Sequence, residues 1–201
     1  MTIIAFISQK GGVGKSTLSQ ALAVEAKKQK ISVLLADCDP QQSTSYEWSK
    51  LNKKINCQVF NSVKEIWSLS SQYDLIIIDG PARTSAGTLE IAKKADLLIQ
   101  PTGASRADLI PAVKEFNALK KAGIPNKKLL FVLTRLSTPA EAKAVQQQYL
   151  KKTDYACSPF YLMEKASYKQ IQNEGKSITQ TKYKGLTKQA KELVSSLLDY
   201  L

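Results

Sequence analysis

The chain has 201 residues, a length typical of one domain, and 43% of them are hydrophobic, enough for a substantial core. It contains no histidine, and its three cysteines (Cys38, Cys57 and Cys157) lack the spacing of metal ligands. A zinc centre and a histidine-based triad are therefore excluded, and the scattered, odd number of cysteines fits a reducing cytoplasm better than a disulfide framework. No apolar run reaches the roughly 18 residues of a spanning helix, and no signal-peptide pattern opens the chain. We therefore expect a single cytoplasmic domain, residues 1–201.

The net charge of +12 is concentrated in the second half of the chain. Residues 1–100 have 12 basic and 9 acidic side chains, whereas residues 101–201 have 17 basic and 8 acidic ones. Between positions 165 and 191, seven lysines accompany a single glutamate. Such an asymmetry is found in proteins that bind polyanions, and also in proteins with a lysine-rich solvated surface. Charge alone leaves both interpretations open.

Apolar runs alternate with amphipathic segments along the whole chain. The predicted strands are 3–7, 32–37, 58–60, 75–79, 96–100 and 128–134, and the predicted helices are 14–30, 44–53, 63–70, 86–94, 107–122, 139–151, 164–173 and 186–200. Near-continuous apolar runs such as LIIID at 75–79 are typical of strands buried on both faces of a parallel sheet. The alternation predicts a doubly wound α/β fold, with a mostly parallel sheet and helices on both faces.

A glycine-rich segment joins the first predicted strand to the first predicted helix. It reads Lys10-Gly11-Gly12-Val13-Gly14-Lys15-Ser16-Thr17. Glycines let backbone N–H groups turn toward an anion, and the N-terminus of the following helix attracts the same anion. The segment therefore predicts a phosphate-binding loop for a Mg-nucleotide. In it Lys15 would reach the terminal phosphates, Ser16 would bind Mg²⁺, and Thr17 would reach the α phosphate. A turn that merely joins strand to helix is the structural alternative.

The loop departs from the general G-x-x-x-x-G-K-[ST] pattern. Gln9 stands six positions before Lys15, where that pattern has glycine, and a second lysine, Lys10, opens the loop. In this respect the sequence resembles the deviant Walker A ATPases of the ParA/MinD type. The resemblance implies that Lys10 is the family's signature lysine, which crosses an ATP-sandwich dimer to the phosphates of the partner subunit. An exposed loop lysine without such a role is the alternative for Lys10.

Two further motifs support the resemblance, and both stand at the ends of predicted strands. Asp37-Cys38-Asp39-Pro40-Gln41 resembles the family's D-x-D-P-Q switch, and Asp79-Gly80-Pro81-Ala82 resembles its Walker B strand and second switch. Parallel sheets bind ligands at the carboxyl ends of their strands. The resemblance implies that Asp79 holds the water shell of Mg²⁺, with Ser16 and Asp39 as further metal ligands. Asp39 would also orient the attacking water, with Asp37 as second candidate. Each carboxylate taken alone is also compatible with a strand-end group or a helix N-cap.

Weaker similarity extends over the rest of the chain. Thr134-Arg135 stands where the family packs against adenine. The segment 164–169, with 174–178, resembles the late part of partition proteins, which more often has arginine where Lys165 stands. The short N-terminus matches the small plasmid-type ParA proteins rather than the larger ones with an additional DNA-binding domain.

The resemblance implies a ParA-like partition ATPase that uses ATP and Mg²⁺ and forms a homodimer on ATP. The dimer would bind DNA non-specifically on the nucleoid, until a ParB-like protein or cargo adaptor stimulates hydrolysis. Its cargo would be a plasmid, a chromosome or a protein assembly. The lysines predicted to contact DNA are Lys165, Lys169, Lys182 and Lys184.

Two other classes of protein remain as alternatives. A MinD-type membrane switch needs a C-terminal amphipathic helix with bulky anchors, and segment 186–200 has no Phe or Trp, so we expect no stable membrane association. A small metabolic P-loop enzyme would usually have an added substrate domain, for which 201 residues leave little room.

Overall fold

The computed structural model describes residues 1–81 and 85–200, with only the backbone described at positions 85 and 86. A seven-stranded sheet forms the centre of this part of the chain, in the order β3-β2-β4-β1-β5-β6-β7, and all of its pairings are parallel. The strands are β1 (Thr2–Phe6), β2 (Val33–Asp37), β3 (Asn56–Val59), β4 (Leu75–Asp79), β5 (Leu97–Thr102), β6 (Leu129–Leu133) and β7 (Ala156–Cys157). The predicted fold class is confirmed.

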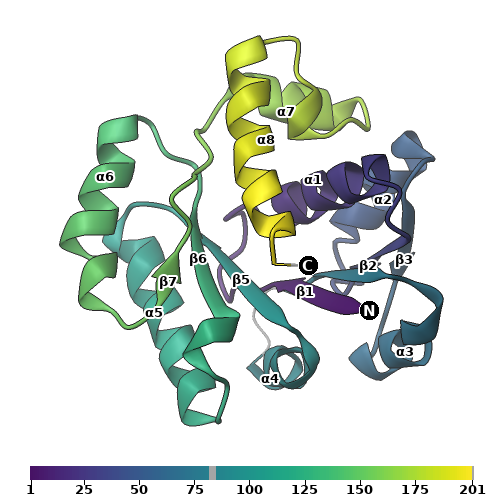
Figure 1. Cartoon of the computed structure of the whole chain (residues 1–201), viewed down its shortest axis with the longest axis horizontal. Helices are drawn as coiled ribbons and strands as arrows, with labels where there is room; N and C mark the ends of the chain where they lie inside the picture. Colours follow the sequence, from purple (N-terminus) through teal and green to yellow (C-terminus); the bar gives the residue numbers. More distant parts are fainter. Residues whose placement is uncertain (82–84, 201) are drawn as a thin grey trace.

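Helices cover both faces of the sheet (Figure 1). One face packs against α1 (Lys15–Lys28), α2 (Thr44–Asn52), α7 (Ala166–Asn173) and α8 (Lys184–Leu198). The other packs against α3 (Val63–Ser68), α4 (Ser85–Lys94), α5 (Arg106–Lys121) and α6 (Pro139–Gln148). Short 3₁₀ turns lie at Ser70–Gln72, Asn126–Lys128, Leu150–Lys152 and Ile178–Gln180. None of the helices in the described ranges is both long and apolar enough to span a bilayer.

Successive side chains along each strand point to opposite faces of the sheet, and this divides the core into two layers. Ile4 and Phe6 of β1 point into the layer under α1 and α8, whereas Ile3 and Ala5 point into the layer under α4 and α5. Successive side chains of a strand face opposite sides of the sheet, so a central strand must be apolar throughout. This explains why these strands read as continuous apolar runs.

The strand order brings the predicted motifs together. β1 lies between β4 and β5, and β2 lies on the far side of β4. Asp37 and Asp79 are direct partners in the register of β2 with β4, and Phe6 is paired with Asp79 across β1 and β4. The loops that follow β1, β2 and β4 therefore meet at one edge, where ligands bind in open parallel sheets.

Several predicted boundaries were wrong by a few residues. β3 begins two residues earlier than predicted, and the two-residue strand β7 was missed because it is too short to show a pattern. Helix α6 ends at Gln148, and a 3₁₀ turn replaces its predicted last turn. Helix α7 begins at Ala166 rather than 164, because Met163 forms a parallel bridge with Leu136 and keeps the chain extended. Helix α8 begins two residues early, at Lys184.

Candidate functional site

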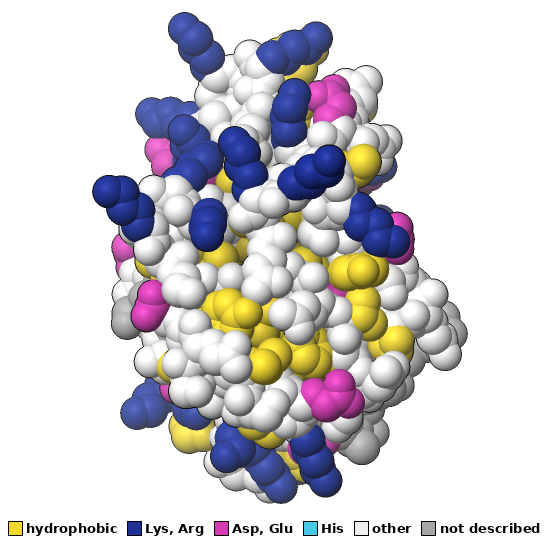
Figure 2. Space-filling view, turned by 90° about the vertical axis from the view of Figure 1, so that its right-hand side faces the viewer, with side chains coloured by type: hydrophobic (Ala, Val, Ile, Leu, Met, Phe, Trp, Pro, Cys, Tyr) yellow, Lys and Arg dark blue, Asp and Glu magenta, His cyan; other side chains and the backbone are white. Residues whose placement is uncertain are grey.

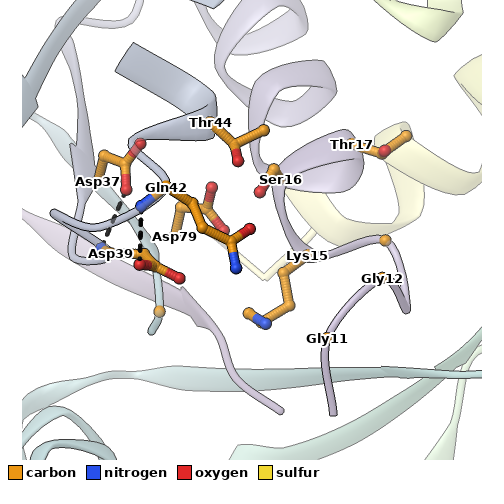
Figure 3. A pocket seen from close by; sticks show the side chains of 12 residues that line it. Gly11, Gly12, Lys15, Ser16, Thr17, Asp37, Asp39, Gln42, Thr44 and Asp79 are labelled. Atoms are coloured by element: carbon orange, nitrogen blue, oxygen red, sulfur yellow. Dashed lines mark hydrogen bonds between the residues drawn. The ribbon is translucent and has the colours of Figure 1, made fainter. Parts of the chain in front are cut away.

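The glycine-rich segment leaves β1 and turns directly into α1. Gly14 is the N-cap of α1 with a φ of 99°, a conformation that a residue with a side chain rarely adopts. The first N–H groups of α1 are thereby exposed toward the space in front of the loop, which is the arrangement that binds anions. Figure 3 shows Lys15 and Ser16 lining this space from one side and Asp37, Asp39 and Asp79 from the other.

That space is a cavity of about 230 Å³. Its lining comes from three loops: residues 11–17 after β1, residues 37–44 after β2, and residues 79–80 after β4. Gly80 allows the third loop to approach closely, because its N–H donates to the Phe6 carbonyl at 2.9 Å and a Cβ would collide with that oxygen. Ala82, the last residue of the predicted second-switch motif, lies outside the described residues.

Lys15 is 9% exposed and lies among carboxylates. Burial lowers the pKa of Lys15 below its ordinary value, although the charges of Asp79 and Asp39 act in the opposite direction. Burial penalises the charge of this ammonium group more than the neighbouring carboxylates offset it, so an anion that enters the cavity would stabilise it. Lys15 is therefore suited to meeting a phosphate.

The two carboxylate oxygens of Asp79 have different surroundings. Its Oδ2 accepts a hydrogen bond of 2.7 Å from the Ser45 hydroxyl, whereas its buried Oδ1 has no hydrogen-bond partner among the described residues. Burial raises the pKa of Asp79 to about 6, while the Ser45 hydrogen bond, the neighbouring Ser16 hydroxyl and the Lys15 charge act to lower it. A buried, unpartnered carboxylate oxygen beside a serine hydroxyl, Ser16, is a hard oxygen donor set that suits Mg²⁺ or one of its waters.

Asp37 and Asp39 have different surroundings although both line the cavity. Asp37 is 1% exposed; its Oδ1 accepts from the N–H of Asp39, and its Oδ2 accepts from the N–H groups of Ser45 and Tyr46. It thereby fixes the start of α2. Burial raises the pKa of Asp37, and these backbone hydrogen bonds oppose the rise. Asp39 is half-buried, and only one of its two carboxylate oxygens accepts a hydrogen bond within the described part of the chain, from the N–H of Gln42 at 3.2 Å.

The side chain of Lys10 points away from the cavity. Its Nζ forms an ion pair with Asp108 near the start of α5 and lies 3.4 Å from the Ala107 carbonyl oxygen. Burial acts to raise the pKa of Asp108, but the Lys10 and Ser105 hydrogen bonds lower it below its ordinary value. The lysine side chain is 42% exposed. In the single chain, Lys10 is therefore held by its own subunit.

A second pocket of about 360 Å³ adjoins the first along the glycine-rich segment. Thr134 and Arg135, the predicted adenine neighbours, line it and hold the loop: Thr134 Oγ1 donates to the Val13 carbonyl at 2.7 Å, and Arg135 Nη1 donates to the Gly12 carbonyl at 3.4 Å. Lys165 and Lys169, two predicted DNA ligands, line the same pocket. These two lysines therefore lie both at the second pocket and near the protein surface.

The predicted DNA-contacting lysines all lie in the segment from α7 to α8. Lys169, Lys182 and Lys184 are exposed, and Lys165 is half-buried at the N-cap of α7. Lys169 forms an ion pair with Glu164 at 3.0 Å, and Lys182 lies over the Tyr183 ring. Figure 2 shows basic side chains gathered over the upper part of the molecule, the level at which Figure 1 places α7 and α8.

Sequence reasoning missed three polar residues that shape the site. Ser45 and Gln20 are buried partners in a hydrogen-bond chain that reaches Asp79. Glu115 of α5 is 4% exposed and accepts from the Gln9 N–H at 3.2 Å and from Gln100 Nε2 at 2.6 Å. A signal for Glu115 was present, because it falls on the same helical stripe as the apolar core residues of α5.

Fold and site together define a P-loop nucleotide-binding protein, with a buried lysine in a glycine-rich loop opposite strand-end carboxylates. Comparison with known proteins specifies the class further. Residues 4–178 match the CobQ/CobB/MinD/ParA nucleotide binding domain family (CbiA), and the chain belongs to that family.

Individual relatives agree with this assignment. The chain is 29% identical over 190 residues to the maintenance of carboxysome distribution protein A of Gloeobacter kilaueensis, covering 89% of this chain and 84% of the relative. The ATP complex of a Cyanothece McdA variant superposes with a TM-score of 0.73 at 21% identity, over 99% of this chain and 96% of that one. A chain of the MinC:MinD cell division protein complex of Aquifex aeolicus superposes with a TM-score of 0.75 at 15% identity, over 99% of this chain and 96% of that one. These two structures establish the likeness of fold.

Proposed function

We propose that this protein is a ParA-like partition ATPase. It binds ATP with Mg²⁺, dimerises on ATP, binds DNA non-specifically, and hydrolyses ATP when a ParB-like protein or cargo adaptor stimulates it. The cycle segregates or positions a plasmid, a chromosome or a protein cargo. The observation that carries the proposal is the pair of lysines in one loop, with Lys15 buried in the cavity and Lys10 held outside it.

The cavity supports the nucleotide part of the proposal. The backbone N–H groups of residues 11–17 and the Lys15 ammonium would bind the phosphates, while Ser16 and Oδ1 of Asp79 would hold the metal and its waters, with Asp39 nearby. When bound, the metal would neutralise part of the charge of the phosphates. Thr134 and Arg135 flank the base.

The surroundings of the carboxylates favour Asp39 as the residue that orients the attacking water. It lies in the cavity with one carboxylate oxygen free of hydrogen bonds within the described ranges. Asp37 is bound on both oxygens by backbone N–H groups, which suits it to shaping the loop. Phosphoryl transfer depends on positioning and electrostatics more than on a strong base, so a carboxylate in this place is sufficient.

Dimerisation is supported by the placement of Lys10. Its ion pair with Asp108 is partly exposed, and such pairs contribute about 0–1 kcal/mol, so the lysine is released at small cost. A phosphate on a facing subunit would offer Lys10 a charge-assisted contact in a desolvated interface, which is stronger. When Lys10 leaves Asp108 for a phosphate of the facing subunit, nucleotide binding is linked to formation of the dimer.

The basic segment supports binding to DNA rather than to a membrane. Lysine contacts with phosphates carry no sequence information, so the expected binding is non-specific and falls steeply with salt. The apolar face of α8, which a MinD-type anchor would need, is buried on α1: Leu193, Val194 and Leu197 are fully covered. We therefore favour DNA over lipid as the polyanion.

Co-sedimentation with plasmid DNA and, separately, with anionic liposomes tests the proposal. We expect retention on DNA with Mg-ATP, little retention with Mg-ADP, and none on liposomes. Lys15→Ala, which removes the ammonium group from the cavity, should lose ATP binding and with it DNA retention, whereas Lys27→Ala, on the exposed end of the same helix, should behave as wild type. Retention on liposomes but not on DNA would support the MinD-type alternative. ATP hydrolysis that is indifferent to DNA, with no retention on either, would indicate a metabolic enzyme.

A further inference from the structure

A chain of side-chain hydrogen bonds runs from the metal-site carboxylate through the protein to α7. Ser45 Oγ donates to Asp79 Oδ2 at 2.7 Å, and Gln20 Nε2 donates to Ser45 Oγ at 3.3 Å. Gln172 Nε2, at the end of α7, donates to Gln20 Oε1 at 2.8 Å. The chain ends where Thr17 Oγ1 donates to Gln172 Oε1 at 3.4 Å.

The direction of every bond in this chain follows from its first member. An ionised Asp79 only accepts, so the Ser45 hydroxyl must donate to it and can only accept from Gln20. The amide of Gln20 is then oriented with its oxygen toward Gln172, and the Gln172 oxygen is left to accept from Thr17. Gln20 is 2% exposed, so each lost bond leaves a buried polar group without a partner. The four bonds therefore form one cooperative unit.

Both ends of the chain lie in the nucleotide site, and one of its inner members, Gln172, lies on the lysine-bearing helix. Thr17 and Asp79 line the 230 Å³ cavity, whereas Gln172 stands on α7 one turn after Lys169. Helix α7 has only eight residues, and Tyr168 is the one among them that is buried. Its orientation therefore depends strongly on polar contacts such as that of Gln172.

A second connection joins the same segment to α2, which follows the first switch loop. Trp48 Nε1 donates to the Lys176 carbonyl at 3.2 Å, and Asn52 Nδ2 donates to the Gly175 carbonyl at 2.7 Å. The start of α2 is held by Asp37 through the Ser45 and Tyr46 N–H groups. Residues 172–176 are thus attached to two elements that begin at the nucleotide site.

We propose that Gln172 and Gln20 transmit nucleotide occupancy from the cavity to α7 and so control the orientation of its lysines. Phosphate oxygens compete with Gln172 for the Thr17 hydroxyl, so an occupied cavity withdraws the last donor of the chain and α7 loses one of its tethers. Only one part of this inference rests on the proposed function, namely that reorienting the α7 lysines changes the affinity for DNA. The movement of α7 itself is independent of what the lysines bind.

Hydrogen–deuterium exchange of residues 166–176, measured on the 201-residue chain, tests the link without DNA. Exchange is measured without nucleotide and with saturating Mg-ADP or Mg-ATP, for wild type, Gln172→Met, Gln20→Met and the double variant. Methionine preserves volume and removes both polar ends. Gln170→Met is the matched control, because Gln170 is exposed on the same helix. We expect nucleotide to change α7 exchange in wild type and in Gln170→Met. Gln172→Met should reduce that change about threefold or more, the size typical of a coupling residue.

The double variant distinguishes a shared link from two unrelated defects. If Gln20 and Gln172 act through one chain, the double variant loses no more nucleotide response than either single variant. A second arm measures the ratio of DNA affinity in ATP to that in ADP, which should fall by about the same factor in Gln172→Met. Unchanged α7 exchange on nucleotide addition in wild type, or a wild-type response in Gln172→Met, would overturn the inference. If wild type binds no DNA with either nucleotide, the proposed function fails, and the exchange arm still decides the link.

Discussion

Asp37 and Asp39 are two residues apart, yet the protein uses their carboxylates in different ways. Replacing Asp37 with alanine leaves the N–H groups of Asp39, Ser45 and Tyr46 without an acceptor. We expect this to cost about 2–3 kcal/mol of stability, or roughly 4–12 °C in Tm for a protein of this size. Asp39→Ala should change Tm little, bind ATP, and stop releasing phosphate. Calorimetry and a phosphate-release assay on both variants check the contrast. Normal phosphate release by Asp39→Ala would contradict its assigned role.

Glu115 gives a prediction about pH. Burial raises the pKa of Glu115 above its ordinary value, while the Gln9 N–H and Lys15 act to lower it. A carboxylate whose pKa is raised in the folded state destabilises that state as pH rises through the interval between the unfolded and folded values. The amide of the Glu115→Gln variant does not titrate. The Tm of this variant, minus that of wild type, should therefore increase between pH 4.5, the ordinary pKa of the group, and neutral pH. A flat or decreasing difference, measured by thermal denaturation, would show that Glu115 is not strained by its burial.

At the scale of elements, helix α5 restrains the first arm of the phosphate-binding loop. Its Asp108 holds the Lys10 side chain, and its Glu115 holds the Gln9 backbone. If Lys10 acts in the facing subunit, weakening its internal partner should favour the dimer. We expect Asp108→Asn to tighten ATP-dependent dimerisation by up to about fivefold for each of the two lysines released, the value of a partly exposed ion pair. Lys10→Ala should lose the dimer and keep monomeric nucleotide binding.

Sedimentation velocity with Mg-ATP over a range of protein concentrations measures both effects. Asp154→Asn is the matched control, since it breaks a similar but exposed pair with Lys120, far along α5. An ATP-dependent dimer of Lys10→Ala with wild-type affinity would contradict the cross-subunit role.

The elements also show what the sequence could predict. β1, β2, β4, β5 and β6 were predicted because buried parallel strands are apolar throughout, and the loop after β1 because its glycines and lysines follow a strict spacing. Two features were not predicted. Strand β7 has only two residues, and the start of α7 depends on the bridge between Met163 and Leu136. The Gln20–Gln172 link was also missed. It joins residues 152 positions apart, and no local pattern indicates such a contact. That residues 1–201 form one ATPase domain stays a prediction.

At the scale of the whole molecule, the unequal distribution of charge gives a prediction about DNA. Replacing Lys165, Lys169, Lys182 and Lys184 with glutamate should abolish DNA retention and lower the salt dependence of any binding that remains. Because Lys165 and Lys169 also line the second pocket, the Lys182→Glu, Lys184→Glu double variant separates loss of DNA contacts from loss of nucleotide. Four exposed lysines outside the α7–α8 segment serve as the control with the same charge change: Lys121, Lys127, Lys151 and Lys152. Filter binding checks the series. If the control variant loses as much DNA retention, the loss reflects net charge and not the position of the α7–α8 lysines.

The central claim is that nucleotide controls a dimer that binds DNA. Sedimentation velocity of the wild-type protein with a short fluorescent duplex tests it in one measurement, because the sedimentation of the duplex reports both binding and the mass of the bound species. With Mg-ATP we predict a complex that contains two protomers, and with Mg-ADP a free duplex. Equal binding in the two nucleotides, or a duplex bound by a single protomer in ATP, would contradict the account.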